Sequence, residues 1–377
     1  MEKPMLSKTS IKVRNGKPSA WGIGLIALDL ILDGHDPKPR LSAGGTCGNV
    51  MAILSRLGWH AVPIARLASG GVSNLVMGDL QRWNVDTSRL QLRPTARVPI
   101  IVQRIRKDAN GIPFHSFSFS CPNCGKRLPS FQAVRTDSIL EMTLQPERRP
   151  KIVFIDRVSR SSISLAEAAS KRGAIIYFEP SAVSQKRLFD ELMQLVHIVK
   201  YSQDRLFDFG ELDWRPQMLL EVRTLGRGGL RFRTTLDSSQ KRWRNLEAVQ
   251  PLRVKDTAGC GDWLSGGLIN TLCRDGLRGL KECTFDQVLG GLAFGQGLAA
   301  WNCGFVGARG GMYSVHEADF ARLVRRLQIG EPVMCTTEDD SVSATGYEGL
   351  ICDVCQPSDG GHDQTVSRIG SLQQRLS

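Results

Sequence analysis

The fold is decided by the stretch Asp256-Thr257-Ala258-Gly259-Cys260-Gly261-Asp262, a loop of small residues that runs directly into a helix-compatible segment. Small side chains there leave successive backbone N–H groups exposed, and the start of a helix adds partial positive charge. Both features stabilise anionic phosphates. We therefore expect an anion hole formed by Ala258, Gly259, Cys260 and Gly261.

The last residue of this 256–262 loop is Asp262, in the first turn of the predicted helix. A carboxylate at that position could accept the proton of a substrate hydroxyl as the hydroxyl attacks a γ-phosphate. Aspartate is also a preferred residue at helix N-termini, so a plain helix cap is the alternative interpretation. We predict that Asp262 is the catalytic base.

Strands and helices are predicted to alternate through most of the chain. A mostly apolar run at residues 21–32 predicts a buried strand that begins a sheet. Residues 151–156, 162–172 and 174–179 repeat the order strand, helix, strand, and such units form parallel sheets. The sequence therefore predicts an α/β fold with a mostly parallel central sheet.

The remaining segments divide the chain into one domain with two tails. Residues 97–106 and 112–120 predict a pair of β-strands joined across Asn110-Gly111, apart from the main sheet. We expect a polar N-terminal tail at 1–20, a domain at 21–330, and a flexible C-terminal tail at 331–377 that contains Cys352 and Cys355.

Composition and charge narrow the classes of function. The net charge of +12 comes from scattered basic residues, which favours a solvated surface and anionic small substrates over a nucleic-acid partner. No run of about 18 apolar residues and no apolar leader are present in the chain. We expect a cytoplasmic protein with no membrane partner.

A second motif, Gly44-Gly45-Thr46-Cys47-Gly48-Asn49-Val50, precedes a predicted helix that ends at Gly58. With the 256–262 loop, it resembles the two signatures of the ribokinase-like (PfkB) family of carbohydrate and nucleoside kinases, over roughly residues 21–327. The resemblance implies a three-layer sandwich with a small β lid, here near residues 33–43 and 97–120. It also implies transfer of a phosphoryl group from ATP, with Mg²⁺, to a hydroxyl of a small sugar or nucleoside.

The resemblance further implies roles for individual residues. Two glycines and two polar side chains would contact the hydroxyls of the substrate: Asp29, Gly44, Gly45 and Asn49. Turn formation by the glycines and a helix cap at Asn49 are the alternatives. The segment at residues 224–229 resembles the family's nucleotide loop, so Thr224, Gly226 and Gly229 would lie beside the nucleotide.

Other segments depart from the family pattern. The family's Asn-x-x-Glu motif, which helps to place Mg²⁺ and phosphate, is replaced by Ser202-Gln203-Asp204-Arg205. The family's Gly-x-Asp-x-x-Gly segment is reduced to residues 69–74, and the interval between Asp29 and Gly44 is short for a lid. The alternative function is therefore a catalytically weak protein that binds a nucleotide or sugar in a regulatory role.

Two cysteine pairs are not explained by the resemblance. Cys121-Pro122-Asn123-Cys124-Gly125 has the form of a zinc knuckle, at residues 121–125. Cys352 and Cys355 form the only other Cys-x-x-Cys pair, and together the pairs could hold a structural Zn²⁺. Two independent reduced or redox pairs are the alternative. A zinc-dependent nucleic-acid-binding protein ranks low, while a homodimer or protein partner could use the lid or the tail.

Overall fold

The computed structural model describes residues 16–33, 39–107, 109, 111, 113–144, 149–183, 185–205, 212–238, 241–331, 351, 352 and 355. Most of the two predicted tails, at 1–20 and 331–377, lies outside these residues. Strand β1 begins at Ser19, just before the predicted start of the domain.

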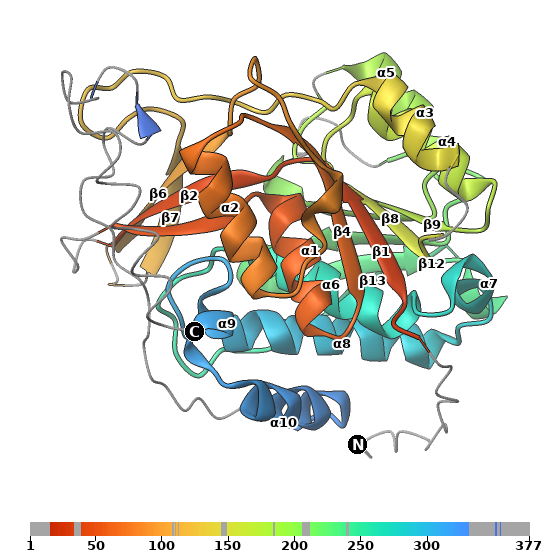
Figure 1. Cartoon of the computed structure of the whole chain (residues 1–377). Helices are drawn as coiled ribbons and strands as arrows, with labels where there is room; N and C mark the ends of the chain where they lie inside the picture. The colour runs from red at the N-terminus through yellow and green to blue at the C-terminus, as the bar shows by residue number, and fades with distance from the viewer. Residues whose placement is uncertain are drawn as a thin grey trace.

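A large sheet forms the centre of the described structure (Figure 1). Its nine strands are, in spatial order, β13 (Arg244–Leu246), β12 (Leu230–Thr234), β11 (Leu220–Thr224), β10 (Ile198–Ser202), β9 (Ile175–Phe178), β8 (Ile152–Ile155), β1 (Ser19–Ile23), β4 (His60–Leu67) and β5 (Leu90–Leu92). Neighbours from β11 to β5 are parallel, and β12 and β13 add antiparallel strands at one edge. The predicted α/β architecture is thereby confirmed.

Helices cover both faces of this sheet because its strands are apolar on both sides. In β8, Ile152 and Phe154 pack in one cluster with residues of α1 (Thr46–Arg56), α6 (Cys260–Leu272) and α8 (Phe285–Asn302). Val153 and Ile155 pack in the opposite cluster with α3 (Thr136–Leu144), α4 (Arg160–Ser170) and α5 (Lys186–Met193). The result is the expected three-layer sandwich, with the helix groups on either side in Figure 1.

A second sheet contains β3 (Arg40–Gly44), β2 (Ala27–Asp33), β6 (Ile100–Lys107) and β7 (Pro113–Ser118), in that order. The predicted antiparallel pair is thus observed as β6 and β7. The single strand predicted at residues 21–32 is wrong, because the chain leaves the main sheet after Ile23 and enters the second sheet at Ala27. Asp156 fixes this crossing, since its Oδ1 accepts a hydrogen bond from the Leu25 N–H at 2.9 Å.

The other described helices are α2 (Gly71–Arg82), α7 (Gly276–Lys281), α9 (Gly310–Ser314) and α10 (Glu317–Gln328). Helices α3 and α5 were not predicted, because segments of nine and eight residues are too short for a clear helical period. In the part of the chain that the structure describes, no helix has the length and hydropathy that a bilayer crossing requires.

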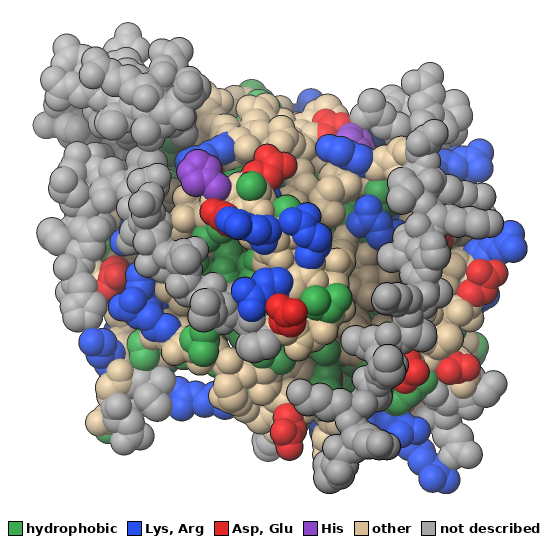
Figure 2. Space-filling view, turned by 90° about the horizontal axis from the view of Figure 1, so that it is seen from below, with side chains coloured by type: hydrophobic (Ala, Val, Ile, Leu, Met, Phe, Trp, Pro, Cys, Tyr) green, Lys and Arg blue, Asp and Glu red, His purple; other side chains and the backbone are tan. Residues whose placement is uncertain are grey.

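The surface charge is mixed. Figure 2 shows one face on which Lys and Arg side chains are spread out, with Asp and Glu among them. On this face there is no continuous basic stripe among the described residues.

Candidate active site

The 256–262 loop leads into the N-terminus of α6, at the edge where the parallel strands of the main sheet end. Gly259 is the residue before this helix and has a φ of 75°, and a Cβ added to it would lie 2.3 Å from the carbonyl oxygen of Ala308. Only glycine fits both restrictions. The loop is therefore built around a residue that cannot be replaced without moving the backbone.

Some backbone N–H groups of this loop donate to protein acceptors, and others have no acceptor among the described residues. The N–H of Ala258 donates to Asp256 Oδ1 at 3.0 Å, and the N–H of Cys260 points at the Thr257 carbonyl at 3.4 Å. Within the described residues, no hydrogen bond occupies the N–H groups of Gly259 and Gly261. Of the four residues predicted to form the anion hole, these two have available donors.

Asp256 anchors the loop to the second sheet. Its carboxylate is fully buried and accepts hydrogen bonds from Gln103 of β6 and from the Gly307 N–H at 2.9 Å. His115 of β7 lies 3.1 Å from the hydroxyl of Thr257. Strands β6 and β7 therefore set the position of the loop, which the sequence alone did not indicate.

Asp262 is buried in the first turn of α6 and is oriented by Asn49 of α1. The Asn49 Nδ2 donates to Asp262 Oδ2 at 2.8 Å, and the Asn49 Oδ1 accepts from Arg309 Nε at 3.0 Å. A donor on one side and an acceptor on the other fix the amide of Asn49 in one orientation. The two predicted motifs thus meet directly, at the predicted base.

Arg309 was missed by the sequence analysis. Its guanidinium is 2% exposed, donates to the Ala43 carbonyl, and forms an ion pair of 2.8 Å with Asp79 of α2. Asp79 also accepts from the Ala43 N–H and from the Tyr313 hydroxyl. Arg309 follows a glycine-rich turn without periodicity, so no sequence signal marked it as buried.

Asp29 lies in the middle of β2, in the second sheet, and not in the strand of the main sheet that was predicted at residues 21–32. Burial raises its pKa to about 7, although Arg309 acts in the opposite direction. Its Oδ1 is buried without a hydrogen-bond partner among the described residues. A Cβ on Gly44 would lie 2.0 Å from this carboxyl group, so Gly44 has to be glycine.

Gly45 provides the sharp turn between β3 and α1. Its φ is 78°, and a Cβ there would lie 2.5 Å from the carbonyl oxygen of Leu25. The N–H of Gly45 also donates to the Asp29 carboxylate. The predicted substrate residues Asp29, Gly44, Gly45 and Asn49 therefore lie in one neighbourhood.

A buried charge pair lies beneath the 256–262 loop. Lys200 of β10 and Glu179, which follows β9, form an ion pair of 2.6 Å, and both side chains are nearly inaccessible. Lys200 Nζ also donates to the Gly261 carbonyl at 2.7 Å, and Glu179 accepts from Ser265 at 2.6 Å. One sequence signal could have indicated this pair: the carboxylate of Glu179 comes directly after the apolar strand Ile175–Phe178.

The predicted nucleotide residues lie on the loop between β11 and β12. Thr224 ends β11 and is paired with Ser202, the last residue of β10, so this loop adjoins the altered segment 202–205. Gly226 has a φ of 57°, and no atom lies within 4 Å of a Cβ added to it. Gly229 has a φ of 85°, and a Cβ there would lie 2.2 Å from the Leu246 carbonyl oxygen. Glycine at this position therefore allows the backbone of the loop to lie close to the backbone at Leu246.

Two carboxylates at this edge of the sheet could in principle serve a divalent metal ion. Asp204 is an exposed carboxylate in the short helix Gln203–Arg205, while Glu179 is engaged by Lys200. Mg²⁺ in phosphotransferases is commonly held by one or two carboxylates together with substrate phosphates. Asp204 is therefore the carboxylate that the segment 202–205 offers for a metal ion.

The four cysteines of the predicted zinc site lie away from this edge, beyond the end of β7. The sulfurs of Cys121, Cys124, Cys352 and Cys355 all lie within 4.8 Å of one another. The structure thus brings together two pairs that are more than 220 residues apart in sequence.

Comparison with known proteins agrees with this architecture. No family model matches the chain. A curated relative, the probable fructokinase-7 of Arabidopsis thaliana, is 24% identical over 264 residues, which are 63% of this chain and 72% of the relative.

Solved structures of kinases share the fold over most of the chain. A fructokinase with bound ATP from Xylella fastidiosa superimposes with a TM-score of 0.62 at 16% identity, covering 82% of this chain and 98% of its own. A nucleoside kinase from Burkholderia thailandensis in complex with inosine gives a TM-score of 0.58 at 16% identity, covering 83% and 99%. The fold is that of the sugar and nucleoside kinases. The predicted resemblance to the ribokinase-like family is confirmed in the fold.

Proposed function

We propose that this chain transfers the γ-phosphoryl group of ATP to a hydroxyl of a small sugar or nucleoside-like acceptor. The observation that carries the proposal is the contact between Asp262 and Asn49, beside the available N–H groups of Gly259 and Gly261. A positioned carboxylate next to an anion-binding helix N-terminus is what phosphoryl transfer requires, because catalysis is mainly orientation and charge stabilisation.

In the transfer step, the acceptor hydroxyl gives its proton to Asp262 and its oxygen bonds to the γ-phosphorus. The bond from that phosphorus to the β,γ-bridging oxygen breaks, and ADP leaves with the bond's electron pair. The N–H groups of Gly259 and Gly261, with the partial positive charge of α6, stabilise the charge on the phosphoryl oxygens. Asn49 keeps the Asp262 carboxylate in place during the step.

The acceptor is proposed to bind between the second sheet and α1. Asp29 Oδ1 is a buried acceptor, and Arg309 Nη1 is a buried donor, and neither has a partner among the described residues. Hydroxyl groups of a polyol could satisfy both atoms, and buried polar atoms gain most from such pairing. Gly44 leaves room for the Asp29 carboxyl group, and Gly45 allows the turn that brings Asn49 to the same place.

The nucleotide is proposed to lie along Thr224, Gly226 and Gly229, at the ends of β10 and β11. A bound Mg²⁺, held by the phosphates with Asp204, would neutralise negative charge between the β- and γ-phosphates. ATP as donor, and cysteines that are free among the residues the structure describes, suit the cytoplasm, which is the proposed compartment.

The test is ATP turnover by the purified chain against a panel of sugars and nucleosides. We expect turnover with at least one acceptor and a decrease in kcat of about 10²–10⁴-fold in Asp262→Asn, the usual contribution of a general base. The matched control is Asp286→Asn, an exposed aspartate in the first turn of α8, which removes the same helix-end charge without the chemistry.

Turnover that is unchanged in Asp262→Asn would assign this residue to helix capping alone. An absence of turnover with every acceptor, together with measurable nucleotide or sugar binding, would favour the regulatory alternative that Ser202-Gln203-Asp204-Arg205 motivates.

A further inference from the structure

Four thiol groups converge at the end of the second sheet, outside the proposed active site. Cys121 and Cys124 flank a tight turn just after β7, and Cys352 and Cys355 come from the C-terminal segment. The sulfurs of Cys121 and Cys355 are 3.9 Å apart, and those of Cys124 and Cys352 are 3.6 Å apart. No other residue type contributes to this four-cysteine cluster within the described chain.

The sulfur separations fit a tetrahedral metal site. A disulfide needs sulfurs about 2.05 Å apart, far closer than either pair. Four sulfurs at about 2.3 Å from a central Zn²⁺ lie about 3.8 Å from one another, which is the separation found for both pairs. The cluster therefore has the size of a four-thiolate zinc site.

The backbone around the first pair has the form of a metal-binding knuckle. The Gly125 N–H donates to the Cys121 carbonyl at 3.0 Å, and the Cys121 N–H donates to the Lys126 carbonyl at 2.8 Å. Gly125 has a φ of 74°, and Ser120 and Arg127 pair as an antiparallel bridge at the base of the turn. A rigid turn of this kind directs two sulfurs to the same side.

The second pair is linked by a local backbone hydrogen bond. The Cys355 N–H donates to the Cys352 carbonyl at 3.2 Å. Cys352 is 4% exposed and Ile351 is 4% exposed, and both pack in the apolar cluster that contains Val98, Ile100 and Leu128. Packing alone thus brings the C-terminal segment to the knuckle, and a metal ion would fix it there.

We propose that Cys121, Cys124, Cys352 and Cys355 bind one structural Zn²⁺ that fastens the C-terminal segment to the second sheet. The four thiols release their protons to solvent on binding, and no oxidation state changes. A ligand set of thiolates alone, in tetrahedral arrangement, selects zinc or iron and disfavours Mg²⁺ and Ca²⁺. The proposal takes zinc, because four cysteines in two closely spaced pairs are a common ligand set of structural zinc sites.

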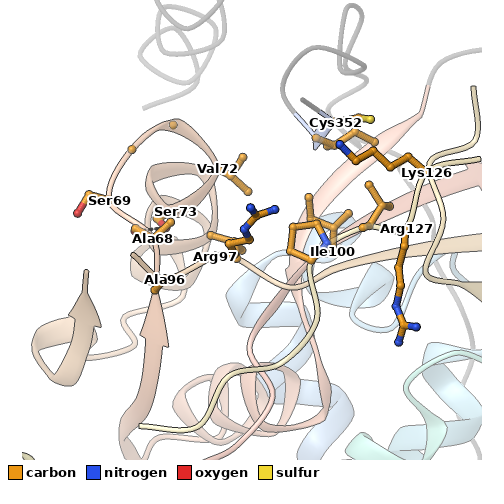
Figure 3. A pocket seen from close by; sticks show the side chains of 16 residues that line it. Ala68, Ser69, Val72, Ser73, Ala96, Arg97, Ile100, Lys126, Arg127 and Cys352 are labelled. Atoms are coloured by element: carbon orange, nitrogen blue, oxygen red, sulfur yellow. Dashed lines mark hydrogen bonds between the residues drawn. The ribbon is translucent and has the colours of Figure 1, made fainter. Parts of the chain in front are cut away.

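The zinc site would also complete the wall of a pocket. Ile351 and Cys352 line a cavity of about 330 Å³ together with Arg97, Lys126 and the residues that begin α2. Figure 3 shows Lys126 and Cys352 on one side of this pocket, with Val72 and Ser73 on the other and Arg97 between them. The cationic side chains complement the net negative charge of a zinc ion with four thiolates.

The decisive measurement is the metal content of the native full-length chain, purified without chelator and without metal-affinity resin. We expect about one zinc ion per chain, released in proportion as an organomercurial titrates the thiols. Replacement with Co²⁺ should give the intense d–d bands of a tetrahedral thiolate site. This measurement needs no variant, so it does not depend on whether a variant folds.

The variant Cys352→Ser with Cys355→Ser should lose the zinc and melt roughly 5 °C or more below the native chain. The control is Cys283→Ser, because Cys283 is a half-buried thiol outside the cluster and should leave the zinc content at the native level. Native protein without stoichiometric metal, with iron in place of zinc, or with disulfides between these cysteines by mass analysis would overturn the proposal.

Discussion

The 256–262 loop and the segment 202–205 lie at the same edge of the main sheet, and among the described residues the loop is held by many parts of the molecule. Residues from β6, β7, α1 and β10 contact the loop, through Gln103, His115, Asn49 and Lys200. The segment 202–205 ends a strand and forms one turn, with an exposed carboxylate at Asp204. Tertiary contacts from four elements therefore constrain the loop, whereas the segment 202–205 is positioned by the end of β10.

The two regions are joined by Lys200, two residues before the altered segment. Its ammonium lies between Glu179 and the Gly261 carbonyl, so the strand that leads into the segment 202–205 supports the loop from below. The ion pair is close to neutral in total, and its role is therefore to hold the loop in position and not to attract phosphate.

The largest expected effect tests this support. Lys200→Met leaves Glu179 buried without its partner, and breaking a buried pair in this way costs about 3–5 kcal/mol of folding free energy. Chemical denaturation of the variant would measure the loss. The matched control is the double variant Lys200→Met with Glu179→Gln, which removes the isolated charge and should recover much of the stability. Equal stability of the native and Lys200→Met chains would contradict the role assigned to the pair.

The next largest effect concerns the loop itself. Gly259→Ala should lower kcat by about 10²–10³-fold, the cost of losing a backbone donor from an anion hole, because the new Cβ displaces the loop from Ala308. Gly173→Ala is the control, since Gly173 has a similar φ of 82° but no atom within 4 Å of the added Cβ. Comparable kcat values in the two variants would mean that only backbone strain had been introduced.

A third effect concerns Asp29, which is proposed to bind the acceptor. The pH dependence of kcat/KM should distinguish its role from that of the 256–262 loop. Asp29 has a pKa raised to about 7, so its carboxyl group is neutral below that pH and ionised above it. The ionised form accepts hydroxyl hydrogens at both oxygens, so kcat/KM for the acceptor should rise about tenfold between roughly pH 6 and 8. Asp29→Asn should lack this rise.

Folding stability should change in the opposite direction at the same residue. The folded chain holds the Asp29 proton more tightly than the unfolded chain, whose pKa is 3.8, so the contribution of Asp29 to stability decreases as pH rises from 3.8 to about 7. The free energy of unfolding and kcat/KM are each compared between the native chain and Asp29→Asn at several pH values. If neither difference between the two proteins changes with pH, Asp29 does not titrate in this range.

The smallest effect is expected from introducing the Asn-x-x-Glu motif that the segment 202–205 lacks. Ser202→Asn with Arg205→Glu adds a carboxylate to the segment proposed to bind Mg²⁺, and the Mg²⁺ concentration for half-maximal turnover should fall by less than about tenfold. Titration of turnover with Mg²⁺ measures it, and Arg227→Glu on the neighbouring loop is a control for added negative charge. A larger gain would mean that the altered segment limits the native chain.

The sequence predicted the features that depend on local composition. Small residues and a following apolar helix were enough to identify the 256–262 loop, and Asn110-Gly111 was enough to pair β6 with β7. The passage of the chain from the main sheet to the second sheet after Ile23 was not predictable. A run of apolar residues has the same pattern whether it forms one buried strand or two.

The side chains that organise the site were predictable only in part. Asn49 and Asp262 were each marked by a motif, but their hydrogen bond depends on the packing of α1 against α6, which no local pattern encodes. From the sequence alone, Arg309 would be interpreted as a surface arginine. Lys200 would be interpreted as an unexplained charge within an apolar strand. They become meaningful only once their partners, Asp79 and Glu179, are brought beside them.

Arg309 has a consequence for how the chain meets its acceptor. One guanidinium ties the end of β3, the amide of Asn49 and the carboxylate of Asp79 together before any ligand is present. Binding to walls that are already ordered loses little conformational entropy. The chain should therefore form a binary complex with its acceptor in the absence of nucleotide, and calorimetry would show a small entropic penalty for it.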